Sequence, residues 1–274
     1  MTNFFTNAIS ELIGYSRSSE LSDPPEKFVI LTVPRTGSSY LCNALNGHPE
    51  ILCHGELFHP KKIFSNTKKN SHVNLGSIQF RNFLPKRFMK RVWEQNFEYS
   101  AVGLKLFPKH SEKALNLILE DPEIKKVLLL RRNRIKSYVS LQIALKTKEW
   151  SLKGFTSKKT TETNRLTSIK VKPRKLQQYV EKTDRFYENM RQKLTASNQK
   201  YLEIAYEDML GTDSEAIKAE LLEFIGVSVN PEYLKSSLKK QNPQPLSQLV
   251  KNYSELESAL QGTELEHYLH QSNL

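Results

Sequence analysis

One short run combines a cation, a glycine and several hydroxyl groups in a pattern that could bind an anion. Its members are Arg35, Thr36, Gly37, Ser38 and Ser39. An apolar, β-branched stretch (28–33) precedes them and a helix-type stretch begins at Tyr40, which predicts a strand, a tight turn and a helix start. The unpaired N–H groups and the positive dipole end of a helix start converge where an anion can bind. Gly37 permits close backbone approach and Arg35 supplies a fixed positive fork, so we predict a phosphate-binding loop.

This loop differs from the P-loops of nucleotide hydrolases. Those loops read G-x-x-x-x-G-K-[ST], with a lysine after the second glycine and a hydroxyl that holds Mg²⁺. Here Gly37 is the single glycine, and the cation, Arg35, precedes it. Taken alone, the run could also be an ordinary corner between a strand and a helix.

A second arginine-rich turn follows about a hundred residues later. A buried-strand pattern over 127–130 runs into Arg131, Arg132 and Arg134, and a helical pattern follows. Cations at a helix N-terminus are unfavourable unless an anion meets them. The turn therefore indicates a second anion site, with a solvated helix start as the alternative.

Both turns resemble elements of the sulfotransferase family. The stretch Pro34–Leu41 (PRTGSSYL) is similar to that family's 5′-phosphosulfate loop. The resemblance implies binding of 3′-phosphoadenosine-5′-phosphosulfate (PAPS) by Arg35, Thr36, Gly37, Ser38, Ser39 and Tyr40. Family members hold the 3′-phosphate with an arginine at a strand end and a serine about two turns further on. Arg132 and Ser140, eight positions apart, match that spacing, and Arg131 is the rival because an offset of one position stays open.

The resemblance extends from about residue 27 to residue 262. Segments 99–108 and 200–210 are similar to two further strands of the family. Segment 239–260 resembles the C-terminal part of bacterial members related to the nodulation and glycolipid sulfotransferases. The resemblance implies transfer of a sulfuryl group to a hydroxyl of a carbohydrate or glycolipid.

Sulfuryl transfer to a hydroxyl also needs a base. Cytosolic relatives carry Lys-Thr-His where this chain has Lys105, Leu106 and Phe107, so a phenylalanine replaces their histidine. Bacterial glycolipid sulfotransferases resemble the segment around Glu56, which implies Glu56 as the base. His54 is the next candidate for the base, followed by His48.

Two cations are candidates for stabilising the transferred group. Arg35 would meet charge developing on the leaving phosphate, and Lys105 would meet the sulfuryl oxygens. A lysine that extends from a strand end to solvent is the alternative for Lys105. His48, Cys53 and His54 have no recognised metal-ligand spacing, so no metal is expected.

Strand and helix patterns alternate along the chain. The expected pairs are 27–33 with 38–46, 100–106 with 111–120, 126–130 with 133–149, and 200–205 with 214–225. This alternation predicts an α/β fold, with a mostly parallel sheet flanked by helices on both faces. The resemblance makes it a single P-loop-like sulfotransferase domain over 27–274, preceded by a helical extension, 1–26. Segment 151–175 is polar and basic and is expected to be a lid, an acceptor loop or disordered.

The net charge of +12 is concentrated in two segments. Residues 57–93 hold nine Lys/Arg and no acid, and residues 153–175 hold eight Lys/Arg and one acid. Such regions favour capture of an anion such as PAPS. A lipid surface would be attracted equally, so peripheral membrane contact stays open. Because no nucleic-acid-binding signature accompanies the charge, a nucleic-acid partner is not expected.

Other sequence features indicate the cellular compartment of the protein. No stretch approaches the roughly 20 apolar residues of a membrane span, and the N-terminus lacks a signal-peptide pattern. With two cysteines, these features predict a cytoplasmic enzyme. A small-molecule kinase and a non-catalytic basic module for anions or lipids are the competing functions. The sequence leaves the acceptor and the oligomeric state open.

Overall fold

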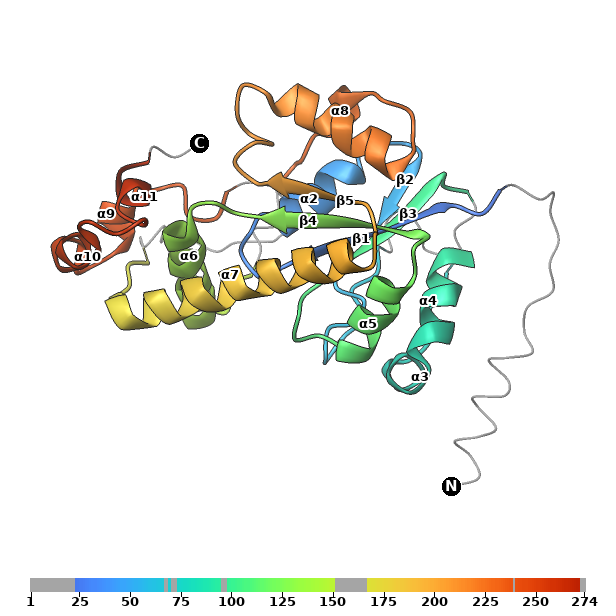
Figure 1. Cartoon of the computed structure of the whole chain (residues 1–274), viewed down its shortest axis with the longest axis horizontal. Helices are drawn as coiled ribbons and strands as arrows, with labels where there is room; N and C mark the ends of the chain where they lie inside the picture. The colour runs from blue at the N-terminus through green and yellow to red at the C-terminus, as the bar shows by residue number, and fades with distance from the viewer. Residues whose placement is uncertain are drawn as a thin grey trace, which may run out of the picture.

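A parallel sheet forms the centre of the protein (Figure 1). The computed structural model describes residues 23–66, 69, 73–94, 98–150, 167–238 and 240–271. Within them the sheet has five strands in the order β2-β3-β1-β4-β5, and each neighbouring pair is parallel. The strands are β1 (Glu26–Thr32), β2 (Ile51–Cys53), β3 (Ala101–Leu106), β4 (Ile124–Leu130) and β5 (Tyr201–Ala205).

Helices cover both faces of this sheet. Those between or beside the strands are α2 (Ser38–Leu45), α3 (Ile78–Phe83), α4 (Pro85–Glu94), α5 (Glu112–Glu120), α6 (Arg134–Thr147), α7 (Pro173–Ala196) and α8 (Ser214–Ile225). A 3₁₀ turn and three short helices follow, namely η1 (Pro231–Tyr233), α9 (Leu246–Leu249), α10 (Tyr253–Leu260) and α11 (His267–His270). In Figure 1, α2 and α8 lie on one face of the sheet, and α4, α5 and α7 lie on the other.

The alternation of side chains along β1 explains the two layers. Val29 and Leu31 pack in a cluster with residues of α4, α5 and α7, whereas Phe28 and Ile30 pack in a cluster with residues of α2 and α8. Successive strand residues point to opposite faces, so an apolar run makes a strand that is buried on both sides. The predicted α/β class, with helices on both faces, is confirmed.

The eight predicted strands and helices are present, with ends within two residues of their expected positions. The structure adds β2, α3, α4, the long helix α7 and the C-terminal elements η1, α9, α10 and α11. Helix α7 begins at Pro173, a residue favoured at the first position of a helix. The last three residues of the predicted variable segment 151–175 are therefore helical, and residues 151–166 lie outside the described residues. Of the predicted extension 1–26, residues 1–22 also lie outside them, and Glu26 already belongs to β1.

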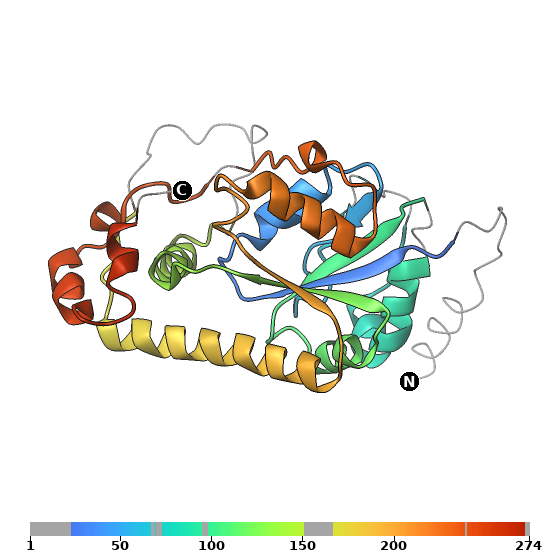
Figure 2. The same ribbon diagram turned by 45° about the horizontal axis from the view of Figure 1, so that its top comes forward.

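The order of the strands brings several loops to one edge of the sheet. Strand β1 pairs with β3 on one side and with β4 on the other. Parallel strands end at the same edge, and ligands of open α/β sheets bind there, where the chain leaves neighbouring strands in opposite directions. Figure 2 shows α6 beyond the end of β4, with the C-terminal helices further out.

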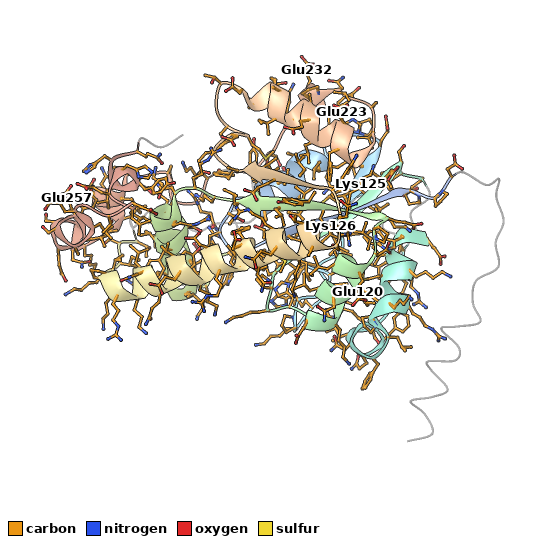
Figure 3. The ribbon with its side chains drawn as sticks, viewed as in Figure 1. Glu120, Lys125, Lys126, Glu223, Glu232 and Glu257 are labelled. Carbon is orange, nitrogen blue, oxygen red and sulfur yellow. The ribbon has the colours of Figure 1, made fainter. Side chains whose placement is uncertain are left out.

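At the opposite edge of the sheet, charged residues stabilise the fold. Lys125 and Lys126 lie near the start of β4 (Figure 3). The buried ammonium of Lys126 donates to the Asp121 carbonyl and to the Gln199 side chain. Burial lowers the pKa of Lys126 to about 8.

Over the described residues, no helix combines the length and apolar character required to cross a membrane.

Candidate functional site

A cavity of about 700 Å³ opens where the strands end. Its walls come from the loops after β1, β2, β3, β4 and β5 and from the segment around residue 240. The predicted site residues on its surface are Arg35, Gly37, Ser38, Ser39, Tyr40, Glu56, Lys105, Arg131 and Ser140. Two others, Thr36 and Arg132, are not part of its lining.

The turn between β1 and α2 exposes backbone donors to this cavity. The first hydrogen bond of α2 runs from the Leu41 N–H to the Gly37 carbonyl, at 3.0 Å. The N–H groups of the three preceding residues, Ser38 to Tyr40, therefore have no acceptor within the helix. The first turn of α2 contains no acidic side chain. This helix start can receive an anion.

Gly37 is needed for a reason that the sequence did not reveal. Its φ is 86°, in the left-handed region, and a Cβ built on it would lie 2.1 Å from a ring carbon of Tyr206. Tyr206 follows β5, two strands away from β1 in the sheet. The glycine thus lets the turn pack against this ring.

The hydroxyl of Thr36 closes the turn from inside. Its Oγ1 lies 2.6 Å from Thr32 Oγ1 and donates to the Val33 carbonyl at 2.9 Å. The residue is 1% exposed. The structure therefore places Thr36 beneath the loop, where it supports the backbone.

Arg35 joins three parts of the chain. Its Nε donates to Ser140 Oγ at 2.9 Å and its Nη1 to the Trp150 carbonyl at 2.8 Å, while its Nη2 donates to Gln241 Oε1. These partners are neutral. Burial lowers the pKa of Arg35, and the nearby charge of Arg131 lowers it further. The guanidinium is thus a partly buried cation whose charge none of these partners neutralises.

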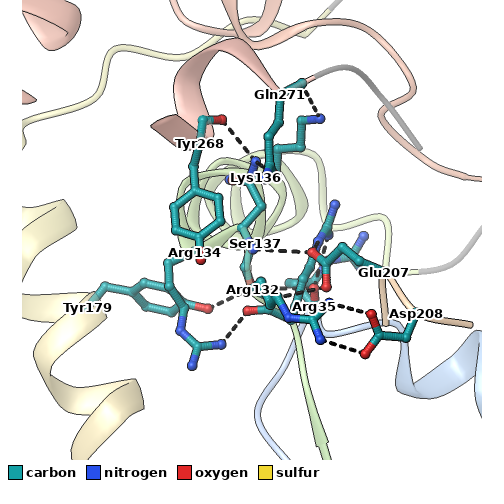
Figure 4. Close-up of polar contacts among 12 residues, drawn as sticks. Arg35, Arg132, Arg134, Lys136, Ser137, Tyr179, Glu207, Asp208, Tyr268 and Gln271 are labelled. Carbon is teal, nitrogen blue, oxygen red and sulfur yellow. Dashed lines mark hydrogen bonds and ion pairs between the residues drawn. The ribbon is translucent and has the colours of Figure 1, made fainter. Parts of the chain in front are cut away.

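The two rival arginines lie in different surroundings, and Figure 4 shows Arg132 beside Asp208. Arg132 makes a two-pronged ion pair with Asp208, with 2.6 Å between Nη2 and Oδ2, and its side chain is 50% exposed. Arg131 lies on the cavity wall with its side chain 12% exposed, and it stacks over Tyr206, 5.3 Å from the ring centroid. Its Nε lies 3.9 Å from Glu207 Oε1, and burial lowers its pKa although Glu207 opposes the change.

The N-terminus of α6 already has an anion of its own. Glu207 accepts the N–H groups of Arg132 at 3.0 Å and Asn133 at 3.2 Å, and the Asn133 side chain caps the Lys136 N–H at 2.8 Å. Arg134 pairs with Asp184 at 2.9 Å. Much of the charge in this turn is therefore balanced by acids of the protein, which the sequence interpretation did not anticipate.

Two lysines join Arg131 on the cavity wall. They are Lys136, from α6, and Lys240, from the C-terminal segment. Burial, followed by the charges of Lys240 and Arg131, lowers the pKa of Lys136 to about 8. Burial and Arg131 also lower the pKa of Lys240. An anion bound here would relieve the repulsion among these three cations.

Glu56 and Lys105 meet on the other side of the cavity. Lys105 Nζ lies 3.2 Å from Glu56 Oε1 and donates to Ser39 Oγ at 3.0 Å. Lys105 is 6% exposed, so it does not extend to solvent as the alternative interpretation required. It connects the phosphosulfate-type loop with the predicted base.

The other base candidates of the sequence analysis lie elsewhere. His48 is buried, with Nε2 3.0 Å from the Ser228 carbonyl and Nδ1 accepting the Glu50 N–H at 3.2 Å, which is a structural role. His54 is buried outside the cavity lining, accepts the Asn66 N–H at 3.1 Å, and has its pKa lowered by burial to about 4. Neither lines the cavity that holds Glu56.

Sequence reasoning missed several residues of the cavity. The most informative are Tyr206, His110, Lys136, Lys240, Gln241 and Asn242. Asn242 donates to Ser140 Oγ at 3.2 Å. The family resemblance of segment 239–260 was the one available signal for the last three. Over the residues that the structure describes, no group of three His, Cys, Asp or Glu side chains is arranged to hold a metal ion.

Comparison with known proteins identifies similar chains. The Sulfotransferase family matches residues 26–231. Nodulation protein H of Rhizobium tropici is 28% identical over 240 residues, covering 85% of this chain and 88% of that protein. Nodulation protein H of Rhizobium meliloti (strain 1021) is 27% identical over 236 residues, covering 85% and 90%. A crystal structure of a sulfotransferase from Alicyclobacillus acidocaldarius aligns with a TM-score of 0.42 and 14% identity, covering 92% of this chain and 98% of that one.

Proposed function

This chain belongs to the sulfotransferase family, and from that premise we propose that it transfers the sulfuryl group of PAPS to a hydroxyl of a carbohydrate or glycolipid. The predicted family is confirmed, and the enzyme is PAPS-dependent by family. One observation supports the proposed donor, acceptor and base. The Glu56–Lys105 pair lies in the same cavity as the uncapped start of α2 and the cations Arg131, Lys136 and Lys240.

The start of α2 fits the 5′-phosphosulfate of PAPS. When bound, PAPS supplies an activated sulfuryl group whose leaving group is 3′,5′-adenosine diphosphate (PAP). The N–H groups of Ser38 to Tyr40 and the Ser39 hydroxyl would hold the phosphosulfate oxygens. Arg35 would stabilise charge on the leaving phosphate, since its present partners are neutral and leave its charge available.

We assign the 3′-phosphate to Arg131 rather than Arg132. Arg132 is engaged by Asp208 and lies off the cavity lining, whereas Arg131 lies on it. Ser140 lies on the same wall, with Lys136 and Lys240 nearby in the lining. A phosphate there would meet three cations and a hydroxyl, which explains why so much positive charge is gathered at one point.

Glu56 is the proposed base. As the bond forms between the acceptor oxygen and sulfur, the bond from sulfur to the leaving phosphate breaks, and Glu56 takes the proton of the acceptor hydroxyl. Lys105 lies between Glu56 and Ser39, so its ammonium would face the transferred sulfuryl oxygens while it fixes the carboxylate. Lys105 would thus contact both the sulfuryl donor, PAPS, and the base, Glu56.

The aromatic lining of the cavity supports a sugar-containing acceptor. The rings of His59, Phe64, Phe107 and Trp150 all line the cavity, and those of His59 and Phe107 pack against His110, which faces Glu56. Flat rings in a cavity that also holds a carboxylate suit the face of a sugar ring and its hydroxyls. The similarity to Nodulation protein H supports the same class of acceptor.

Calorimetry with PAP tests the donor site. Titration without Mg²⁺ should give saturable binding at one site, with ATP at least about tenfold weaker because it lacks a 3′-phosphate. Equal binding of PAP and ATP, or no binding, would reject the sulfotransferase reading of the cavity and favour a kinase or a non-catalytic anion-binding module.

Glu56→Gln tests the base. Transfer of labelled sulfate from PAPS to a panel of soluble oligosaccharides should fall by about 100-fold or more, whereas PAP affinity should stay unchanged. Glu120→Gln, on exposed surface at the end of α5, is the matched control and should leave both unchanged. Equal loss of affinity and turnover in Glu56→Gln would argue against a role as base.

A further inference from the structure

A histidine that the mechanism has not yet used faces the proposed base. His110 Nε2 lies 3.6 Å from Glu56 Oε2, while Lys105 Nζ lies 3.2 Å from the other oxygen, Oε1. The two oxygens of one carboxylate therefore face two different nitrogens. His110 follows β3 by four residues, and it comes three residues after Phe107, which replaces the histidine of cytosolic relatives.

Neighbouring rings fix the orientation of the His110 imidazole. Its ring centroid lies 4.9 Å from that of Phe107 and 5.5 Å from that of His59. The backbone N–H of His110 donates to the Phe107 carbonyl at 3.0 Å, which closes a tight turn. With Phe107 and His59 packed against the imidazole, its two nitrogens are left for polar contacts, and one of them faces Glu56.

The surroundings of the second nitrogen decide the tautomer. Nδ1 is buried and has no hydrogen-bond partner among the described residues. A proton on Nδ1 would leave a buried N–H unpaired, at a cost of about 1–3 kcal/mol, and would turn a lone pair toward the carboxylate. A proton on Nε2 avoids both problems. The neutral imidazole therefore presents an N–H to Glu56.

The imidazole also stays uncharged at neutral pH. Burial lowers the pKa of His110 to about 4. The Glu56 carboxylate opposes this shift, and the charges of His59, Lys105 and Arg81 reinforce it. A second cation on Glu56 would reduce the basicity of its carboxylate, whereas a neutral N–H orients the carboxylate at a smaller cost in basicity.

We propose that His110 is a positioning residue for the sulfuryl transfer, holding the Glu56 carboxylate through a neutral Nε2–H while Lys105 holds the other oxygen. This inference rests on the proposed function of Glu56. The 3.6 Å separation is longer than a formed hydrogen bond. Catalytic contacts are often long in the free enzyme and shorten when substrates bind.

Two substitutions separate the donor from the packing of the ring. His110→Phe keeps a ring between Phe107 and His59 but removes the N–H. His110→Gln can place an amide N–H near the position of Nε2. We expect turnover with the oligosaccharide acceptor to fall about tenfold in His110→Phe and by less than about threefold in His110→Gln. PAP affinity should be unchanged in both.

The pH dependence of kcat/KM distinguishes a positioning role of His110 from a purely structural role. A donor to a carboxylate favours its charged form, so losing the donor makes protonation of that carboxylate easier. The acidic limb of kcat/KM should therefore move to higher pH in His110→Phe and stay in place in His110→Gln. Lys105, His59 and Arg81 face the pair in both variants. Equal turnover and an unmoved limb in His110→Phe would overturn the proposal.

Nuclear magnetic resonance of ¹⁵N-labelled protein tests the contact without any activity. His110→Phe identifies the His110 signals by their loss. The wild type should show the Nε2–H tautomer, and Glu56→Gln should shift these signals and lower the His110 pKa further. An Nδ1–H tautomer, or signals that do not respond to Glu56→Gln, would refute the contact. Failure of the wild type to bind PAP would instead reject the proposed function, and the resonance result would stand independently.

Discussion

The start of α2 leaves its first backbone N–H groups open to the cavity, whereas the start of α6 has them occupied. Both helices follow a buried strand and an arginine. The cap residue of α2, Gly37, makes no side-chain cap, but α6 is capped by Asn133 and its preceding N–H groups are taken by Glu207. Similar local sequences have therefore produced opposite local electrostatics.

The difference lies in what the neighbouring loop supplies. The turn after β5 places Tyr206 against Gly37, and it places Glu207 and Asp208 against the two arginines that precede α6, Arg131 and Arg132. An anion at α2 would be held by the backbone. An anion near α6 would be held by side chains, because the helix start already has its carboxylate. Substitutions that affect one mode and not the other test this division.

The largest effect is expected from Gly37→Ala. The left-handed φ would cost an alanine about 1–2 kcal/mol, and its Cβ would displace the Tyr206 ring and with it the backbone donors. PAP affinity, measured by calorimetry, should fall about 100-fold. Gly262→Ala is the matched control, since Gly262 also has a positive φ but nothing within 4 Å. Unchanged affinity in Gly37→Ala would show that the α2 backbone does not hold the donor.

The next largest effect is expected where side chains would hold the anion, near α6. Arg131→Ala should weaken PAP binding about 10- to 100-fold, as expected for a lost charged hydrogen bond. Arg132→Ala should change it by less than about threefold, since Arg132 already pairs with Asp208. AMP, which lacks the 3′-phosphate, should bind Arg131→Ala and wild type alike. The opposite ranking of the two variants would return the 3′-phosphate to Arg132.

A smaller and opposite effect is expected from Glu207→Gln. Removing the carboxylate beside Arg131 removes a competitor for the incoming phosphate, so PAP should bind roughly threefold more tightly. The same change removes the carboxylate that stabilises the N-terminus of α6, and it should lower the free energy of unfolding by about 0.5–1 kcal/mol. Calorimetry and thermal unfolding measure the two quantities. Weaker PAP binding in a folded variant would mean that Glu207 supports the site.

The smallest effect is an exchange of protons. The pKa of Lys136 is lowered to about 8, so this lysine is partly uncharged near pH 8.5. A bound phosphate favours the ammonium and raises that pKa, so PAP binding should take up a fraction of a proton at about pH 8.5, where the phosphates of PAP (second pKa about 6) are themselves fully ionised, and a smaller fraction at about pH 7.5. Calorimetry in two buffers with different heats of ionisation detects it. Lys136→Met should abolish the uptake, and uptake that persists would point to another group.

Much of the fold could be predicted because its signals are local. The central strands are continuous apolar runs and several helices have clear ends, such as Gly226 after α8. Strand β2 escaped prediction because it has three residues at the edge of the sheet. Helix α7 escaped prediction because it begins inside the polar, basic segment 151–175, although its buried residues recur with helical spacing.

The site was less predictable because its contacts join distant segments. Arg131 and Arg132 are adjacent in sequence, yet neighbouring residues at a strand end point in different directions, and one lies on the cavity while the other meets Asp208. The pairing with residues 207 and 208 spans about 75 positions. No periodic pattern in the sequence could reveal it.

The contact between Arg35 and Gln241 has a consequence for synthesis of the protein. These residues are 206 positions apart in the chain. A ribosome adds roughly 5–20 residues per second, so Gln241 is added about 10–40 s after Arg35. The nascent chain can begin to assemble its sheet during that interval, but the surroundings of Arg35 are completed only after the segment around Gln241 has been translated. A chain truncated before that segment would keep the arginine and lack one of its partners.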